Sequence, residues 1–251
     1  MIRRAVAAAL ALLALAATMP AAAETVVEGR ATWARRATLG FPVSGVIAEL
    51  PVRAGQRVAR GALLARLDPR PFDARVRERE ARVAALEPAF AEARREWERA
   101  QALYERMVLS DRDRELVRIA YVRAEAELRA ARAALARARI EREYAELRAP
   151  FEALVLRVHA VPGQALASRL RVSPVVELAE LGALAVEVAL EGDARPPGAG
   201  AAATVRAAGR RYAGRVERVE PVDRGWRVRV GFRVPPADGI GEGTPVEVIL
   251  P

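Results

Sequence analysis

The chain has 251 residues, of which 52% are apolar and 29% are charged, which suits one large domain or two to three small ones and argues against wholesale disorder. All of its basic residues are arginine, and they alternate with glutamate as on solvated helix faces, so the formal net charge of +9 does not indicate nucleic-acid binding. The absence of cysteine excludes disulfide bonds, thiolate metal sites and a lipid anchor on cysteine.

The first 23 residues have the pattern of a secretory signal peptide. A basic start containing Arg3 and Arg4 precedes an apolar run from Ala5 to Met19, and Ala21 and Ala23 fit an A-x-A cleavage site. We expect cleavage after Ala23, with the net charge falling to about +7. The alternative is an uncleaved membrane anchor, although the run is alanine-heavy and near the lower length limit for a span.

The stretch from Leu39 to Leu67 has the pattern of short strands separated by tight turns. Gly45, Gly55 and Gly61 interrupt runs of aliphatic and β-branched residues. Such spacing of glycines predicts a small β-sandwich.

After Pro71 the large residues recur every seven positions, which predicts a coiled coil. In the first arm, large residues at one heptad position alternate with mostly small residues at the other. The large set is Val76, Val83, Phe90, Trp97 and Tyr104, and the intercalated set is Arg79, Leu86, Ala93, Ala100 and Met107. The second arm has a similar heptad pattern. Its large set is Tyr121, Leu128 and Leu135, followed by Arg142 at the end, and its small set is Ala124, Ala131 and Ala138.

A polar break from Leu109 to Asp113 separates the two arms, and Ser110 or Asp111 is the candidate N-cap of the second helix. Together the arms predict a thin antiparallel helical hairpin, with alanine on both seams and arms about 50 Å long. Pro88 lies inside the first arm and should kink it or remove one backbone hydrogen bond.

The β pattern returns after the hairpin, from Leu147 to Phe151 and from Leu154 to Val158. In this second stretch Gly163-Gln164 stands at a turn, as Gly55-Gln56 does in the first. Two similar β halves on either side of an inserted hairpin indicate an interrupted internal repeat.

Residues from about 175 onward again have the pattern of strands separated by Gly- and Pro-rich turns, beginning with Val175–Leu178. The segment Trp226–Val234 alternates strictly between apolar and polar or small residues, so one face should be buried and the arginine face exposed. We expect a small β-barrel here, completed by a strand from Thr25 to Leu39.

Candidate catalytic and metal-binding residues are few. His159 is the only histidine, and its place in a strand-like run favours an ordinary strand position. Met107 is the only methionine outside the leader, and its heptad position favours packing over metal binding. Trp97 and Tyr104 are seam residues for the same reason. We therefore expect no enzymatic activity, no cofactor and no metal.

The β halves resemble the two lipoyl half-motifs of HlyD-type membrane fusion proteins. The residues that carry the resemblance are Val43–Ile47, Val52, Gly55-Gln56, Val58, Gly61, Leu64 and Leu67–Pro69 in the first half, and Leu147, Ala149–Phe151 and Val161–Gln164 in the second. The order of half-motif, hairpin, half-motif and barrel is similar to that of RND-type efflux adaptors. Ala153 departs from the glycine that the family usually has there, and the chain ends at Pro251 with little of the family's usual membrane-proximal domain.

The resemblance implies an elongated α+β fold, with a lipoyl-like β-sandwich split by an antiparallel coiled-coil α-hairpin and followed by a small β-barrel. The expected parts are a signal peptide (1–23), a strand of the barrel (24–40), lipoyl-like half 1 (41–70), the α-helical hairpin (71–146), lipoyl-like half 2 (147–174) and the β-barrel domain (175–251).

The resemblance also implies a periplasmic adaptor that bridges an inner-membrane transporter and an outer-membrane channel protein, associates with itself into a ring and binds no nucleic acid. The alternatives are an adaptor of an ABC-type or type I secretion exporter, or a structural periplasmic coiled-coil protein. A lipoyl-type cofactor carrier is excluded, because that chemistry needs a lysine and the chain has none.

Adaptors of this family that meet an outer-membrane duct carry Arg, Leu and Ser around the hairpin turn, at positions i, i+4 and i+11. Arg99, Leu103 and Ser110 have this spacing here. Arg99 and Leu103 should share one helical face, with Ser110 at the turn. The resemblance therefore implies that these three residues dock to the duct.

Overall fold

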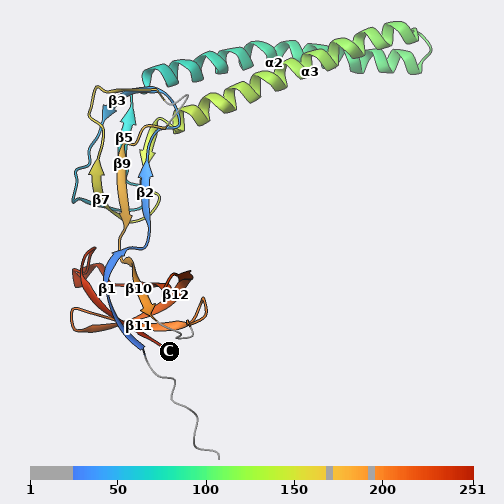
Figure 1. The fold of residues 1–251 in the computed structure, drawn as a ribbon. Coiled ribbons are helices and arrows are strands. Elements are labelled where there is room, and N and C mark those ends of the chain that lie inside the picture. The colour runs from blue at the N-terminus through green and yellow to red at the C-terminus, as the bar shows by residue number, and fades with distance from the viewer. Residues whose placement is uncertain (1–24, 168–171, 192–195) are drawn as a thin grey trace, which may run out of the picture. The chain divides into compact units, whose positions relative to one another are not determined.

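The computed structural model describes residues 25–167, 172–191 and 196–251 and divides the chain into two compact units (Figure 1). One unit comprises residues 36–179 and contains a β-sandwich and a helical hairpin. The other unit is formed by the described residues before position 36 and those from 180 onward, and it is a β-barrel. The predicted signal peptide lies outside the described residues.

The β-sandwich consists of two four-stranded sheets, in the orders β2-β9-β7-β4 and β6-β5-β3-β8. Its strands are β2 (Arg36–Leu39), β3 (Gly45–Glu49), β4 (Arg57–Val58), β5 (Leu63–Leu67), β6 (Glu146–Arg148), β7 (Ala153–Val158), β8 (Ala165–Leu166) and β9 (Val176–Glu180). The largest completely buried side chains of its apolar core are Phe41, Ile47, Leu64, Leu67 and Leu178.

The Gly-Gln turns of the two halves of the sandwich have the same structure, as the repeat in the sequence predicts. Gly55 and Gly163 adopt left-handed backbones, with φ of 82° and 85°, which glycine accepts without steric cost. The amide of Gly55 donates to the carbonyl of Val155 at 2.8 Å, and the amide of Gly163 donates to the carbonyl of Ile47 at 2.8 Å. Each half therefore closes its turn against the central strand of the other half.

The glutamines of the two turns also have equivalent roles. The side-chain oxygen of Gln56 accepts from the amide of Arg53 at 3.0 Å, and that of Gln164 accepts from the amide of Val161 at 3.2 Å. These bonds satisfy turn amides that would otherwise lack a partner within the protein. The internal repeat predicted from the sequence is confirmed.

The hairpin is inserted between β5 and β6 and consists of α2 (Arg70–Glu105) and α3 (Asp111–Glu143). The helix α2 begins next to prolines, which suit a first turn because their missing amides have no helical partner there. It then continues unbroken through Pro88.

The barrel is closed by six antiparallel strands in the order β1-β10-β13-β12-β11-β14. Its elements are β1 (Thr25–Trp33), β10 (Ala183–Glu191), β11 (Ala202–Ala207), β12 (Arg210–Val222), β13 (Gly225–Arg233), the short 3-10 helix η1 (Pro236–Asp238) and β14 (Pro245–Leu250). In β13, Val228, Val230 and Phe232 are buried whereas Arg227 and Arg233 are exposed, which confirms the alternation seen in the sequence.

Two segments that the sequence analysis assigned to the barrel belong to the sandwich instead. The predicted strand from Thr25 to Leu39 is two strands, and the second of these, β2, pairs with β9 and not with a barrel strand. Accordingly, Val175–Leu178 contributes to the sandwich core. The alternation of a strand identifies its buried face but not the sheet that buries it, so the sequence pattern was compatible with either unit.

Candidate docking site at the hairpin tip

The two helices pack along the seam that the heptad pattern predicts. The buried seam residues are Ala100 on α2 and Leu128, Ala131 and Ala138 on α3, and most other predicted seam positions are half-buried. Small residues let the helix axes approach closely, and the large residues fill the layers between them. One such layer contains Phe90 and Tyr121, whose ring centroids are 5.8 Å apart.

Ion pairs between the helices are concentrated in the half of the hairpin nearest the sandwich. They join Asp73 to Arg142, Arg75 to Glu141 (2.7 Å), Glu80 to Arg139 (2.8 Å) and Glu87 to Arg132 (3.0 Å). Exposed pairs of this kind contribute little energy individually, but together they select one register of the two helices. The charged helix faces predicted from the sequence are thus solvated and also help to fix the register of the two helices.

Among the carboxylates of these interhelical ion pairs, Glu141 is the one that pairs with two arginines. It accepts hydrogen bonds from Arg75 and from Arg137, the latter at 3.1 Å. The Arg75 hydrogen bond, aided by Arg137, holds the pKa of Glu141 below its ordinary value against a partial burial that would raise it. The stability that these bonds provide is therefore present above the ordinary carboxyl pKa and is lost as the pH falls through the lowered value.

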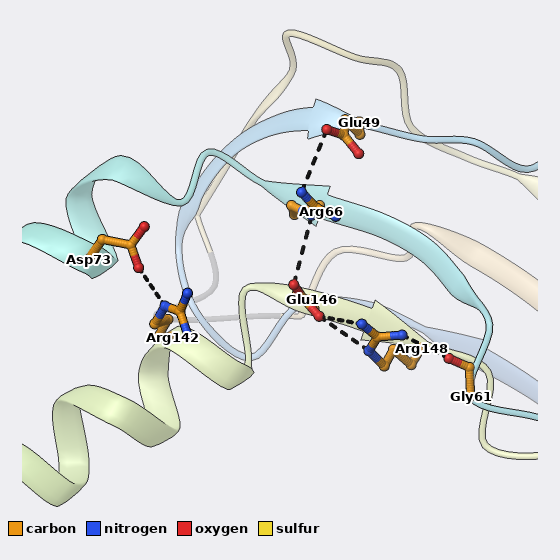
Figure 2. A network of polar contacts seen from close by, with 7 residues as sticks. All are labelled: Glu49, Gly61, Arg66, Asp73, Arg142, Glu146 and Arg148. Atoms are coloured by element: carbon orange, nitrogen blue, oxygen red, sulfur yellow. Dashed lines mark hydrogen bonds and ion pairs between the residues drawn. The ribbon is translucent and has the colours of Figure 1, made fainter. Parts of the chain in front are cut away.

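A polar network lies on the sandwich beside the root of the hairpin, where Asp73 and Arg142 join the two helices (Figure 2). Arg66 of β5 lies between Glu49 and Glu146, at 3.7 and 3.8 Å, and Glu146 also pairs with Arg148 at 2.7 Å. The side chain of Arg148 donates to the carbonyl of Gly61 at 2.9 Å. Because only two residues lie between the end of α3 and the start of β6, the network and the β5-β6 pairing fix the point at which the chain leaves α3 for the β-sandwich.

At the other end of the hairpin, Ser110 is the N-cap of α3. Its hydroxyl accepts from the amide of Asp113 at 3.2 Å and donates to the carboxylate of the same residue at 2.7 Å. Asp111 and Asp113 lie in the first turn, where negative charge interacts favourably with the helix dipole. Of the two caps that the sequence allowed, Ser110 is therefore the one used.

The other two predicted docking residues lie in the last turns of α2. Arg99 is exposed and pairs with Glu96 at 2.9 Å. Leu103 is half-buried, and its carbonyl accepts from the amide of Val108 at 3.0 Å. All three residues thus lie toward the distal end of the hairpin, on both sides of its turn, and the Arg99–Glu96 pair is exposed to solvent.

The turn itself ends α2 by a Schellman motif, which the sequence analysis missed. The amide of Met107 donates to the carbonyl of Tyr104 at 2.8 Å, and the amide of Val108 donates to that of Leu103. Met107 occupies the position after the C-cap, with a left-handed φ of 58° and 95% of its surface exposed. The prediction that Met107 packs in the heptad seam is wrong, because α2 ends at Glu105, before that heptad position is reached.

A signal for this turn was present in the sequence. A helix that starts after Ser110 requires the preceding helix to end several residues earlier, so Met107 could not remain helical. One contact that stabilises the turn could not be predicted from the sequence, because it joins residues of two different helices. The guanidinium of Arg114 lies 4.0 Å from the centroid of the Tyr104 ring, which is a cation–π contact across the tip.

The described residues offer little other chemistry. His159 is exposed, and its Nε2 atom lies 3.9 Å from a carboxylate oxygen of Glu177. Within the described ranges no cluster of three or more metal-ligating side chains is found. In the same part of the chain, no helix combines the length and the hydropathy needed to cross a membrane.

The capping role of Ser110 leads to a first prediction. Replacing Ser110 with Ala should lower the stability of the first turn of α3 by about 1 kcal/mol, because the amide of Asp113 loses its acceptor. Hydrogen exchange at the tip amides should then be about fivefold faster, with the rest of the hairpin unchanged. Ser110→Asp keeps a capping oxygen and should restore the protection. Equal exchange in the Ala variant and the native protein would contradict the capping role.

The chain is similar to known membrane fusion proteins at the level of sequence. A family model described as the RND MFP barrel-sandwich hybrid domain matches residues 35–178, more than half of the chain. The multidrug resistance protein MdtA of Pectobacterium carotovorum strain PC1 is 31% identical over 122 residues, which are 49% of this chain and 30% of that protein. MdtA of Photorhabdus laumondii strain TT01 is 30% identical with the same coverage. The match thus spans less than a third of these curated relatives.

Solved structures show the same fold. The membrane fusion protein Spr0693 of Streptococcus pneumoniae R6 has a TM-score of 0.66 at 14% identity, covering 90% of this chain and 98% of that one. A MacA-MexA chimeric protein containing the Pseudomonas aeruginosa MexA α-hairpin domain has a TM-score of 0.60 at 21% identity, covering 90% and 80%. The α+β fold predicted from the sequence is confirmed. With the family model matching both β halves and the hairpin between them, the chain belongs to the RND-type membrane fusion protein family.

Proposed function

We propose that this protein is a periplasmic adaptor of a tripartite efflux pump, which bridges an RND-type inner-membrane transporter and an outer-membrane exit duct. The observation that carries the proposal is the family match over residues 35–178, which includes both halves of the sandwich and the whole hairpin. An adaptor needs an extended element held rigidly at one end and free at the other. In the hairpin, the ion pairs between the helices lie in the half nearest the sandwich, and an exposed turn forms the other end.

The length of the hairpin supports this role. The helices α2 and α3 have 36 and 33 residues. At the rise of an α-helix each is about 50 Å long. The ion pairs stabilise the end nearest the sandwich, whereas the bonds and the cation–π contact at the tip join residues of the hairpin itself. In the proposed pump, the tip contacts the duct and the β-barrel faces the transporter.

A groove on the distal half of the hairpin supports self-association into a ring. Its apolar wall is formed by Ala89, Ala93, Leu116, Val117 and Ala120, with Glu92 and Glu96 also lining it, and its volume is about 550 Å³. Leu116 is the large apolar side chain of this groove that is left to solvent, with 56% of its surface exposed. A surface of this kind is costly in water unless a second protein covers it. In the proposed ring, the hairpin of a neighbouring copy does so.

The proposal assigns no catalytic step to this chain. Substrate passes through the assembly, and the adaptor supplies contacts and length, without a cofactor or a metal. The leader pattern of residues 1–23 supports export to the periplasm, with cleavage after Ala23.

A crosslinking experiment in the native host tests the proposal. A thiol introduced by Arg112→Cys is unique, because the chain has no cysteine. Arg112 is preferred to Ser110 because it is exposed and does not cap the helix. We expect the thiol to capture an outer-membrane duct protein, and we expect capture to be lost when Arg99 and Leu103 are both changed to Ala.

The matched control is Arg77→Cys, an exposed position on α2 near the root. It should not capture the duct, because it lies many helical turns from the tip. Equal capture from both positions, or no capture by an exported and folded Arg112→Cys protein, would contradict the proposed function. Recovery of an ABC-type transporter with the complex would redirect the assignment to that class of exporter.

A further inference from the structure

The most unusual backbone of the hairpin lies at its tip. Among the described residues, the only two other than glycine with a positive φ are Met107 and Ala208. Ala208 is small and precedes Gly209 in the turn between β11 and β12. Met107 is therefore the one large side chain of the described residues in the left-handed conformation, at a position that glycine occupies in most Schellman motifs.

The Schellman bonds hold the backbone of this turn, but the described part of the protein does not cover its apolar side chains. Met107 has 95% of its surface exposed, and the neighbouring Val108 has 70% exposed. An apolar side chain on a strained backbone, directed away from its own protein, is unfavourable for the isolated chain. Such strain is characteristic of functional positions, where another interaction makes use of it.

Net charge does not offer an alternative basis for recognition at this turn. The segment 105–114 has three carboxylates and three guanidinium groups, which are Glu105, Asp111, Asp113, Arg106, Arg112 and Arg114. Arg114 pairs with Asp111 at 3.3 Å, and Asp113 is bonded to Ser110. Because the charges balance over the turn, long-range attraction is weak, and burial of the apolar side chains adds affinity to the contacts proposed for Arg99, Leu103 and Ser110.

We propose that Met107, together with Val108, forms an apolar knob that inserts into an apolar pocket at the periplasmic end of the outer-membrane duct. The inference rests on the proposed function and adds two contact residues to Arg99, Leu103 and Ser110. The Schellman bonds couple the knob to these residues, because the amide of Val108 is bonded to the carbonyl of Leu103. The unbranched thioether side chain of methionine adapts readily to the shape of such a pocket.

The test uses the opposite effects of one substitution on folding and on docking. Met107→Gly relieves the left-handed strain, so hydrogen exchange of the tip amides in the purified full chain should slow by about twofold to fivefold. The same change removes the knob, so duct capture through the Arg112→Cys thiol should fall by at least about tenfold. A residue with only a structural role would not make the tip more stable and docking weaker.

Two further variants sharpen the comparison. Met107→Asn also accepts the left-handed backbone but is polar, and it should behave as Met107→Gly does. Met107→Leu keeps the apolar bulk and the strain, and it should capture the duct within about threefold of the native residue.

The outcomes separate this inference from the proposed function. Undiminished capture by Met107→Gly, alongside normal capture by the Arg112→Cys parent, overturns the knob and leaves the adaptor role intact. If the parent itself captures no duct, the proposed function fails and the knob fails with it.

Discussion

Replacing Phe41 with Ala is expected to lower the free energy of unfolding of the sandwich by about 3–5 kcal/mol. Phe41 is completely buried and is among the largest side chains of the sandwich core. Its removal exchanges well-packed contacts for a cavity that the surrounding strands cannot fill. Since a typical domain is stable by only about 5–15 kcal/mol, the loss is a large part of the total.

Urea unfolding followed by far-ultraviolet circular dichroism measures this effect, because both helices belong to the same unit as the sandwich. The matched control is Val46→Ala, in β3 of the same sandwich but outside its core, where 45% of the residue's surface is exposed. It should change the stability by less than about 1 kcal/mol. Similar losses in the two variants would show that burial of Phe41 is not what holds the sandwich together.

The second large effect is expected in the hairpin. Leu128→Asp places a carboxylate in the seam at a position that is only 3% exposed. The substitution loses apolar burial and adds the cost of desolvating a charge without a partner, together about 4 kcal/mol or more. Few other buried residues hold the seam together, so the loss should separate the arms over the distal half. Separate helices of this kind are only marginally stable in water.

The same change at Leu116 is the control. Leu116 lies on the same helix, but 56% of its surface is exposed, so an aspartate there remains solvated and the helix should persist. Limited proteolysis should therefore cleave the hairpin of Leu128→Asp rapidly and that of Leu116→Asp at close to the native rate. Protease resistance of Leu128→Asp would mean that the seam does not hold the arms.

Leu116→Asp also bears on the proposed ring, because Leu116 lines the groove of the hairpin. We expect this variant to fold but no longer to associate with other copies. That result would show that the seam and the groove of the hairpin have different roles. Seam residues hold the arms together, whereas groove residues face a neighbouring copy.

Much of this architecture follows from local patterns in the sequence. The heptads predict the hairpin because side-chain directions repeat with a fixed period along a helix. The Gly-Gln turns predict the repeat because the left-handed backbone at Gly55 and Gly163 requires glycine. Ser110 is recognisable as an N-cap from its chemistry and its place after a helical pattern.

Other features could not be predicted in this way. The strands β2 and β9 resemble the barrel strands in sequence, and only their pairing with each other places them in the sandwich. The heptad pattern continues to Met107, although the helix that carries it ends at Glu105.

The sequence by itself therefore determined the types of elements, their order and the site residues proposed from the family resemblance. The tertiary structure alone decided which sheet each strand joins, where α2 stops and which apolar side chains remain exposed at the tip. The physical reason is the range of the interactions. Periodicity, capping and turn chemistry act over a few residues, whereas strand pairing and the closure of the hairpin turn depend on segments that are distant in the chain and meet only in the fold.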